Sequence, residues 1–302
     1  MFFESTKAEI EDLADDLFLQ DQVHVSVLRL DKIHPVVSGN KLFKLHYFLQ
    51  EALHSGHQTI LSFGGAYSNH LAATAFAGKA LHLKCIGIVR GERPLHLSTT
   101  LQQCIQDGME LKFISRQEFD TKENAQLIST LQNEYGEFIL VPEGGYHPLG
   151  SKGAALIMDL FNPGDYTHIC TATGTATTLA GLLMASKPEL TIIGIPVLKG
   201  MTDINERIKY LVNREPVRGE LQILQDHHFG GYAKKTEELI RFMNDCWHQY
   251  HLPLDFVYTA KMMYAIKASI INKYFPKGSK ILCLHTGGLQ GNISLPLNTL
   301  LF

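Results

Sequence analysis

Short apolar runs of strand length alternate with amphipathic segments of helix length along almost the whole chain. The expected strands cover residues 24–30, 58–63, 83–89, 110–114, 138–141, 168–172, 190–197, 220–224, 256–258 and 280–285. The expected helices between them begin near residue 41 and continue at 68–79, 97–106, 117–135, 151–161, 177–186, 203–212, 234–250 and 262–273. Strands that are apolar throughout and alternate with helices are typical of parallel sheets covered on both faces. The pattern therefore predicts an α/β fold, preceded by a short acidic amphipathic segment at residues 9–19.

The first long helix carries a lysine at its start. Its apolar positions between Leu45 and Leu53 are three and four residues apart, which is the spacing of a helix face that packs on a core. When it is extended back by one turn, this face includes Lys41. Lys44 lies off the face, so its replacement is expected to cost little activity. A lysine that faces a core loses solvation, which lowers its pKa and frees a nucleophilic amine. The alternative is that Lys41 extends from the helix end into water.

Composition limits the classes of function. A chain of 302 residues suggests two domains or one large domain, and a net charge of −3 offers no basic field for nucleic acid. No stretch is long and apolar enough to span a bilayer. The 15 histidines are scattered without ligand spacing, so no metal site is predicted.

The N-terminal residues and the cysteines indicate a reducing compartment. Residues 1–5 lack a basic region followed by an apolar run, so no signal peptide is predicted. The five cysteines are odd in number and widely spaced, and three of them lie in strand-like runs. This distribution favours buried, reduced thiols. We therefore expect a cytoplasmic protein.

Small and hydroxyl residues gather where four of the expected strands end, which is where α/β folds bind ligands. The most informative run is 171–178, in which five threonines and a glycine separate a strand from a helix. Backbone N–H groups, hydroxyls and a helix start in such a loop can hold a phosphate without a lysine. The run lacks the glycine patterns of dinucleotide and nucleoside-triphosphate sites. A threonine-rich turn that only caps its helix is the alternative.

A second run, Gly64-Gly65-Ala66-Tyr67-Ser68-Asn69, precedes another helix. Ser or Asn alone could be an ordinary helix cap, but two glycines also let the backbone approach a ligand closely. A core-facing lysine, a phosphate loop and a Ser-Asn cap together suggest pyridoxal phosphate, because its aldehyde requires a lysine and its phosphate a fixed cradle.

Four motifs in order carry a family resemblance. They are Ser-Gly-Asn-Lys-Leu-x-Lys-Leu from residue 38, Gly-Gly-x-x-Ser-Asn-His from 64, Tyr-Thr-x-Lys-Met from 258 and His-Thr-Gly-Gly from 285. Between Leu28 and Gly288 the chain resembles the fold-type II pyridoxal-phosphate enzymes, and more narrowly the family of D-cysteine desulfhydrase and 1-aminocyclopropane-1-carboxylate deaminase. The resemblance implies a two-domain, three-layer fold like that of the tryptophan synthase β-subunit. A larger domain would comprise residues 1–43 and 151–302, with a smaller domain at 44–150 inserted into it.

The resemblance also implies roles for residues. Lys41 would bind the cofactor covalently and later move the α-proton, and Asn69 would hydrogen-bond the cofactor's 3′-oxygen. Ser68 would hold the carboxylate of a small amino-acid substrate, with Asn69 and His70 close by. The cofactor phosphate would be held by Thr173, Gly174, Thr175, Ala176, Thr177 and Thr178. A homodimer is expected at the level of the family only.

The two tyrosines and two threonines near the C-terminus bear on the reaction. Tyr258 and Tyr232 match the active-site tyrosines of the family. The resembling deaminases have a glutamate at the position of Thr259 and an aliphatic residue at that of Thr286, whereas threonine at both is the desulfhydrase pattern. A carboxylate would keep the pyridine nitrogen protonated, but a threonine leaves the ring a weaker electron sink. One of these threonines could instead be only a local cap.

These features predict a lyase or deaminase that eliminates the thiol of D-cysteine and releases a 2-oxo acid, ammonia and sulfide. The first alternative is 1-aminocyclopropane-1-carboxylate deaminase, and the second is a non-catalytic protein that binds pyridoxal phosphate or another phosphate on the same fold. Tyr67, where the family has a glutamine, and Thr177, where it has a glycine, depart from the pattern. Tyr67 adds bulk beside the substrate carboxylate.

Overall fold

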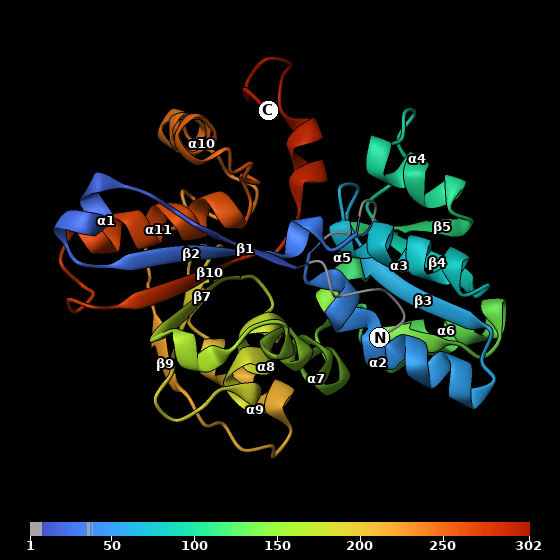
Figure 1. Ribbon diagram of the computed structural model, residues 1–302. Coiled ribbons are helices and arrows are strands. Elements are labelled where there is room, and N and C mark those ends of the chain that lie inside the picture. Colours follow the sequence, from blue (N-terminus) through green and yellow to red (C-terminus); the bar gives the residue numbers. More distant parts are fainter. Residues whose placement is uncertain (1–7, 35–36, 38) are drawn as a thin grey trace.

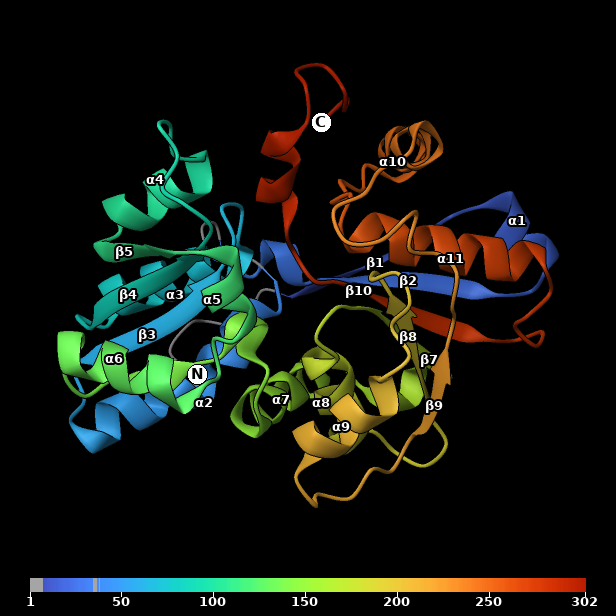
Figure 2. The same cartoon turned by 180° about the vertical axis from the view of Figure 1, so that it is seen from behind.

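The computed structural model describes residues 8–34, 37 and 39–302. The segment on which the signal-peptide prediction rests, and Ser38 of the lysine motif, lie outside the described residues. Two sheets, each with its own helices, lie side by side and are seen from opposite directions in Figures 1 and 2. The α/β, two-sheet prediction is confirmed.

The larger sheet has six strands in the order β1-β2-β10-β7-β8-β9. These are β1 (Glu9–Asp12), β2 (His24–Arg29), β10 (Lys280–His285), β7 (His168–Thr173), β8 (Thr191–Pro196) and β9 (Glu220–Ile223). β1 pairs antiparallel with β2, and the other neighbours are parallel. The acidic start of the chain was therefore predicted only in part, because it forms an edge strand before the short helix α1 (Asp16–Gln20).

Helices cover both faces of this sheet (Figure 1). One face carries α1, α10 (Glu237–Tyr250) and α11 (Thr259–Ile271). The other carries α7 (Pro148–Ala155), α8 (Thr177–Ala185) and α9 (Ile204–Val212). The four inner strands, β2, β10, β7 and β8, are buried along almost their whole length, which explains why their sequences are mostly apolar, whereas the edge strands β1 and β9 are partly exposed.

The smaller sheet has four parallel strands in the order β5-β4-β3-β6. They are β5 (Met109–Ile114), β4 (Lys84–Arg90), β3 (Thr59–Gly64) and β6 (Ile139–Val141). One face packs against α2 (Lys41–Ser55), α3 (Asn69–Ala80) and α4 (Thr99–Gln106), and the other against α5 (Arg116–Asp120) and α6 (Ala125–Tyr135). All four strands fall between residues 44 and 150.

Two predicted elements were wrong. The single helix expected at 117–135 is two helices, because Ser115 and Asn124 each cap a separate helix start. The strand expected at 256–258 is a turn, since the Asp255 carboxylate accepts hydrogen bonds from the backbone N–H groups of the next residues and starts α11 instead. Short 3₁₀ helices complete the chain at Leu30–Lys32, Glu143–Gly145, Leu156–Leu160, Pro163–Asp165 and Leu289–Ser294.

Helix α2 joins the two sheets. It packs closely on α7 of the larger sheet at Gly153, where an added Cβ would lie 2.0 Å from the carbonyl oxygen of Phe43. Its start is placed by Gly39, which adopts φ +83° and whose Cβ would lie 1.9 Å from the carbonyl oxygen of Thr286. Residues Leu42 to Leu45 are consequently all buried, so the helix start has no exposed face there.

Within the described ranges, no helix is both long enough and apolar enough to cross a membrane.

Candidate active site

A pocket lies at the carboxyl ends of β7 and β10, beside the start of α2. It is lined by Asn40, Lys41, Lys44, Asn69, Gly144, Ala172, Thr173, Gly174, Thr175, Ala176, Thr177, Thr178, Leu179, Tyr258, Thr286, Gly287 and Gly288. This is where α/β folds bind ligands, because the loops after parallel strands meet at that edge. The lysine and the threonine-rich loop expected to bind a cofactor therefore do share one site.

Lys41 is the first residue of α2, and the side chain of Asn40 holds its amine in place. Its Nζ donates to Asn40 Oδ1 at 2.7 Å, and Asn40 Nδ2 donates to Thr178 Oγ1 at 2.8 Å. The amine lies 5.9 Å from the centre of the Tyr258 ring. Burial lowers the pKa of Lys41 to about 8, and the charge of Asp255 limits this shift. Asn40, which sequence reasoning left without a role, thus links the reactive amine to the threonine loop.

Lys44 also lines the pocket, which corrects the expectation that it faces away. Its side chain is 6 % exposed, and Nζ donates to the carbonyl oxygen of Gly144 at 3.3 Å. In the described part of the chain it has no carboxylate partner. Burial, and then the charge of Lys41, place the pKa of Lys44 well below its ordinary value. The three-residue spacing of the two lysines was the available signal, because residues i and i+3 share a helix face.

The threonine loop forms the opposite wall. Ala176 adopts φ +63° at the start of α8. No side chain of the described residues caps this helix, so its first N–H groups remain available to an anion. The hydroxyls of Thr175 and Thr177 are 2.8 Å apart, and Gly174 lies against the Tyr258 ring. The loop is thus more than a self-contained turn that caps its own helix.

These groups fit pyridoxal phosphate. Among the described residues, Lys44 is a buried amine without a counter-ion and α8 has no side-chain cap at its N-terminus, so both can bind a phosphate in this pocket. Lys41 offers an amine with a lowered pKa to an aldehyde. Asn69 lines the same pocket, and its Oδ1 is buried without a hydrogen-bond partner among the described residues.

The two threonines considered for the pyridine nitrogen have different surroundings. Thr286 lines the pocket. Thr259 is fully buried outside the pocket wall, where its hydroxyl donates to Asp255 Oδ1 at 2.8 Å and accepts from the Asp255 N–H at 2.8 Å. A role for Thr259 at the cofactor would therefore act through Asp255 and its neighbours.

The residues expected to bind substrate do not line the pocket, except for Asn69. Ser68 Oγ accepts from the Leu71 N–H at 3.2 Å and caps α3, while Tyr67 is 51 % exposed and His70 is buried within the fold. Burial, followed by the charges of Lys41 and Lys44, lowers the pKa of His70 to about 3, so its ring is neutral.

The two tyrosines are neighbours at the open side of the site. The ring centres of Tyr232 and Tyr258 are 6.1 Å apart, with Tyr258 on the pocket wall and Tyr232 at 55 % exposure. Burial raises the pKa of Tyr258 well above its ordinary value, so its hydroxyl keeps its proton.

An α/β fold with a lysine of lowered pKa, a threonine-rich loop at a helix start and a second buried amine in one pocket is the arrangement expected of a pyridoxal-phosphate enzyme. The family described as "Pyridoxal-phosphate dependent enzyme" matches residues 17–287, and the chain belongs to it. Its cofactor is pyridoxal phosphate, as the motifs indicated.

Similar proteins with names indicate the branch of the family to which this chain is similar. A Pyrococcus abyssi protein named "Putative 1-aminocyclopropane-1-carboxylate deaminase" is 30 % identical over 286 residues, which cover 89 % of this chain and 86 % of that protein. A Thermotoga maritima protein of the same name is 29 % identical over 285 residues, or 89 % of each chain. The crystal structure of an "ACC deaminase homologue" superposes with a TM-score of 0.80 at 27 % identity, covering 96 % of this chain and 92 % of that one. The predicted family is confirmed.

Proposed function

We propose that the protein eliminates the thiol of a small amino acid, D-cysteine first. The Cβ–S bond breaks, Lys41 takes the α-proton, and one water molecule is consumed, so that cysteine and water give a 2-oxo acid, ammonia and hydrogen sulfide. Bound pyridoxal phosphate supplies the sink for the electrons left at Cα. The broader assignment, a pyridoxal-phosphate enzyme of the 1-aminocyclopropane-1-carboxylate deaminase family, follows from the family match and the relatives.

The observation that carries this proposal is the position and protonation of Lys41. Its amine lies between Asn40 and Tyr258 in the pocket, and its pKa of about 8 leaves about a tenth of it neutral at pH 7, far more than for an ordinary lysine. A neutral amine both binds an aldehyde and accepts a proton. Tyr258, which keeps its own proton, can donate a hydrogen bond on the same side.

The polar groups of the pocket favour elimination over ring opening. Those described residues that line it include no carboxylate. The nearest buried one, Asp255, already accepts from the N–H groups of Val257, Tyr258 and Thr259 and from the Thr259 hydroxyl, so its charge is largely satisfied. Thr286 would offer the pyridine nitrogen a hydroxyl in place of a carboxylate, so bound pyridoxal phosphate would supply a moderate electron sink, which suffices when a thiolate leaves.

Opening of the cyclopropane ring of 1-aminocyclopropane-1-carboxylate is the second candidate. The names of the Pyrococcus and Thermotoga relatives favour it. That substrate has no α-proton, so the ring must open by another route and places a greater demand on the electron sink. A non-catalytic binding protein is disfavoured because the family is one of enzymes.

One preparation can decide between the two reactions. D-cysteine, L-cysteine and 1-aminocyclopropane-1-carboxylate are each incubated with the enzyme, and sulfide, 2-oxo acid and ammonia are followed. We expect sulfide from D-cysteine and little turnover of the cyclopropane. Turnover of the cyclopropane without sulfide from either cysteine would overturn the proposal. The variant Thr286→Leu, which gives the pocket wall the aliphatic residue of the resembling deaminases, should shift the ratio of the two reactions toward ring opening.

Other assignments remain proposals. Ser68, Asn69, His70 and Tyr67 would surround the substrate, and Tyr232 would cover it opposite Tyr258. The proposed domain boundaries lie at residues 43/44 and 150/151, and a homodimer is proposed from the family. If the Ser68→Ala variant needs a higher amino-acid concentration than the wild type for the same change in its absorbance spectrum, the assignment of Ser68 to the substrate site is supported.

A further inference from the structure

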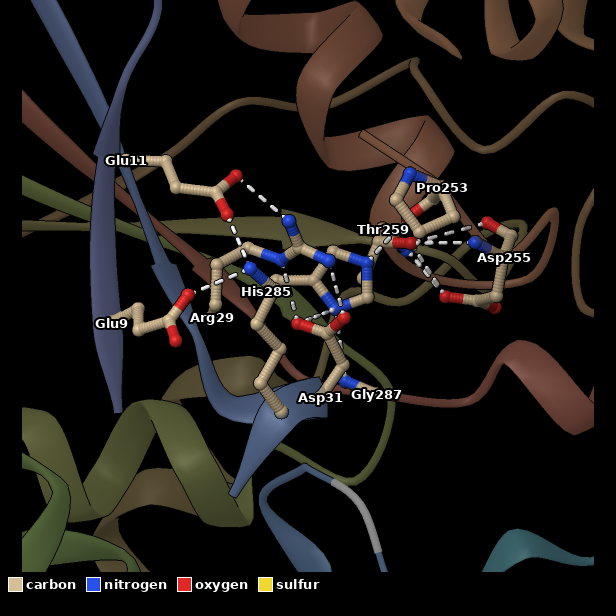
Figure 3. Close-up of polar contacts among 10 residues, drawn as sticks. Glu9, Glu11, Arg29, Asp31, Pro253, Asp255, Thr259, His285 and Gly287 are labelled. Carbon is tan, nitrogen blue, oxygen red and sulfur yellow. Dashed lines mark hydrogen bonds and ion pairs between the residues drawn. The ribbon is translucent and has the colours of Figure 1, made fainter. Parts of the chain in front are cut away.

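A chain of buried charges lies behind the pocket wall formed by residues 286–288 (Figure 3). Arg29 donates from Nη1 to Glu11 at 2.7 Å. Its Nε and Nη2 donate to the two oxygens of Asp31 at 2.9 and 2.7 Å. Asp31 Oδ1 then lies 3.1 Å from Nδ1 of His285. The side chains of Arg29, Asp31 and His285 are at most 4 % exposed, so this chain is inside the protein.

Both ring nitrogens of His285 face oxygen acceptors. Nε2 lies 2.7 Å from the carbonyl oxygen of Pro253, which cannot donate, so Nε2 must carry a proton. Nδ1 faces Asp31, whose pKa is lowered against burial by its hydrogen bond to Arg29 and by the charge of His285. An ionised carboxylate accepts only, so this contact is favourable when Nδ1 carries a proton as well.

A competing contact at Nδ1 is weaker. The backbone N–H of Gly287 approaches Nδ1 at 3.4 Å, and it could donate there only to an unprotonated nitrogen. The carboxylate oxygen is nearer, at 3.1 Å, and although this contact is an ion pair by distance and not a hydrogen bond, an unprotonated Nδ1 would place its lone pair against the anion. The geometry therefore favours an imidazolium. The chain continues from Glu11 to Lys32 and Glu9, so with the imidazolium three carboxylates and three cations balance, which lowers the cost of burying the inner ones.

This pair joins two strand ends that lead to opposite parts of the pocket. Asp31 follows β2, from which the chain runs to Gly39 and Lys41, while His285 ends β10 and leads directly to Thr286. Gly39 N–H donates to the carbonyl oxygen of Leu30 at 2.8 Å, and Asn40 N–H donates to that of Thr286 at 3.3 Å. A shift of either strand end would thus move the amine of Lys41 relative to Thr286.

We propose that His285, held as an imidazolium by Asp31, is a positioning residue that fixes the Thr286–Gly288 wall against Asn40 and Lys41. It touches neither cofactor nor substrate, and it acts through the distance between the two strand ends. This inference rests on pyridoxal phosphate as the cofactor and not on which amino acid the enzyme uses.

The protonation state can be measured on the unaltered apo-protein. Nitrogen NMR of protein labelled in its histidines, with the His285 signals assigned by their loss in His285→Gln, should show both ring nitrogens protonated near neutral pH. A neutral ring with one unprotonated nitrogen would overturn the imidazolium. The result does not depend on catalysis, so it stands or falls separately from the proposed reaction.

The positioning role is tested by cofactor affinity. Because glutamine can serve only one of the two acceptors, His285→Gln should weaken pyridoxal-phosphate binding by about tenfold, and Asp31→Asn should do the same. Both should also shift the absorbance maximum of the bound cofactor. The matched control is His24→Gln, which breaks an exposed His24–Asp12 pair of the same 3.1 Å length and should change neither property. Lower thermal stability with unchanged affinity and spectrum would reduce His285 to a structural residue and overturn the proposal.

Discussion

The two sides of the pocket differ in whether other protein groups already form hydrogen bonds with their polar side chains. On the side of the larger sheet, Asn40 connects Lys41 to Thr178. On the side of the smaller sheet, Asn69 Oδ1 is buried without a hydrogen-bond partner among the described residues, and Tyr67, just outside the pocket lining, is half exposed. We infer that the polar groups on the cofactor side are held in place before any ligand binds. Those on the substrate side gain their hydrogen-bond partners from the ligand. Substitutions on each side can test this contrast.

The largest effect is expected at Lys41. Lys41→Ala should lower turnover by at least about a thousandfold, because it removes both the amine that binds the aldehyde and the base that takes the α-proton. Thermal stability should be almost unchanged, since alanine is well tolerated at a helix start. The exposed Lys209→Ala is the control, and activity near that of the wild type in Lys41→Ala would remove Lys41 from the mechanism.

Lys44→Met should weaken binding of pyridoxal phosphate by about tenfold to a hundredfold, because it removes an amine that can donate to the phosphate. The same change should raise the melting temperature of the apo-protein, since it replaces a buried amine without a counter-ion among the described residues by an apolar chain of similar length. Opposite effects on affinity and stability are the signature of a preformed anion site. Unchanged affinity would separate Lys44 from the phosphate.

The pH dependence of cofactor uptake tests the environment of Lys41. Its pKa is lowered to about 8, so the neutral amine, which is the reactive form, increases as the pH rises to this value. The rate at which apo-protein takes up pyridoxal phosphate should therefore rise about tenfold per pH unit below this pKa and level off above it. A rate still climbing toward the ordinary lysine pKa of about 10.4 would contradict the burial of the amine.

The smallest effect is expected on the substrate side. Tyr67→Ala should change KM for the amino acid by about threefold to tenfold, with kcat and cofactor affinity nearly unchanged, because it alters ground-state binding. Tyr210, exposed to a similar extent on α9, provides the control variant Tyr210→Ala. Weaker cofactor binding in Tyr67→Ala would show that the two sides of the pocket are not separable.

The sequence was sufficient for the parts of the site that depend on local pattern. The strand–loop–helix order predicted the fold, and Lys41 and the loop from Thr173 to Thr178 do line one pocket. The prediction for Lys44 was wrong because the apolar face of α2 is defined by its later turns, whereas its first turn is buried between the two sheets. That burial depends on Gly153 and α7, more than 100 residues away in the chain, which no local pattern records.

The polar partners of Thr259 were also beyond local pattern. Its position in the tyrosine motif suggested the cofactor, but Asp255 occupies its hydroxyl through a turn where the pattern predicts a strand. The charges behind Thr286 were missed for a different reason. Glu11, Arg29 and His285 are far apart in sequence, and each is unremarkable by itself.

The covalent attachment point of the cofactor is the decisive measurement. Purified protein loaded with pyridoxal phosphate is reduced with borohydride and digested, and the modified lysine is found by peptide mass analysis. Three lysines compete, because Lys44 shares the pocket and Lys261 is buried with its pKa lowered to about 8 by burial. We expect modification at Lys41 alone, with Lys44 and Lys261 unmodified. A colourless protein without modification, or a cofactor trapped on either of the other two lysines, would contradict the role assigned to Lys41.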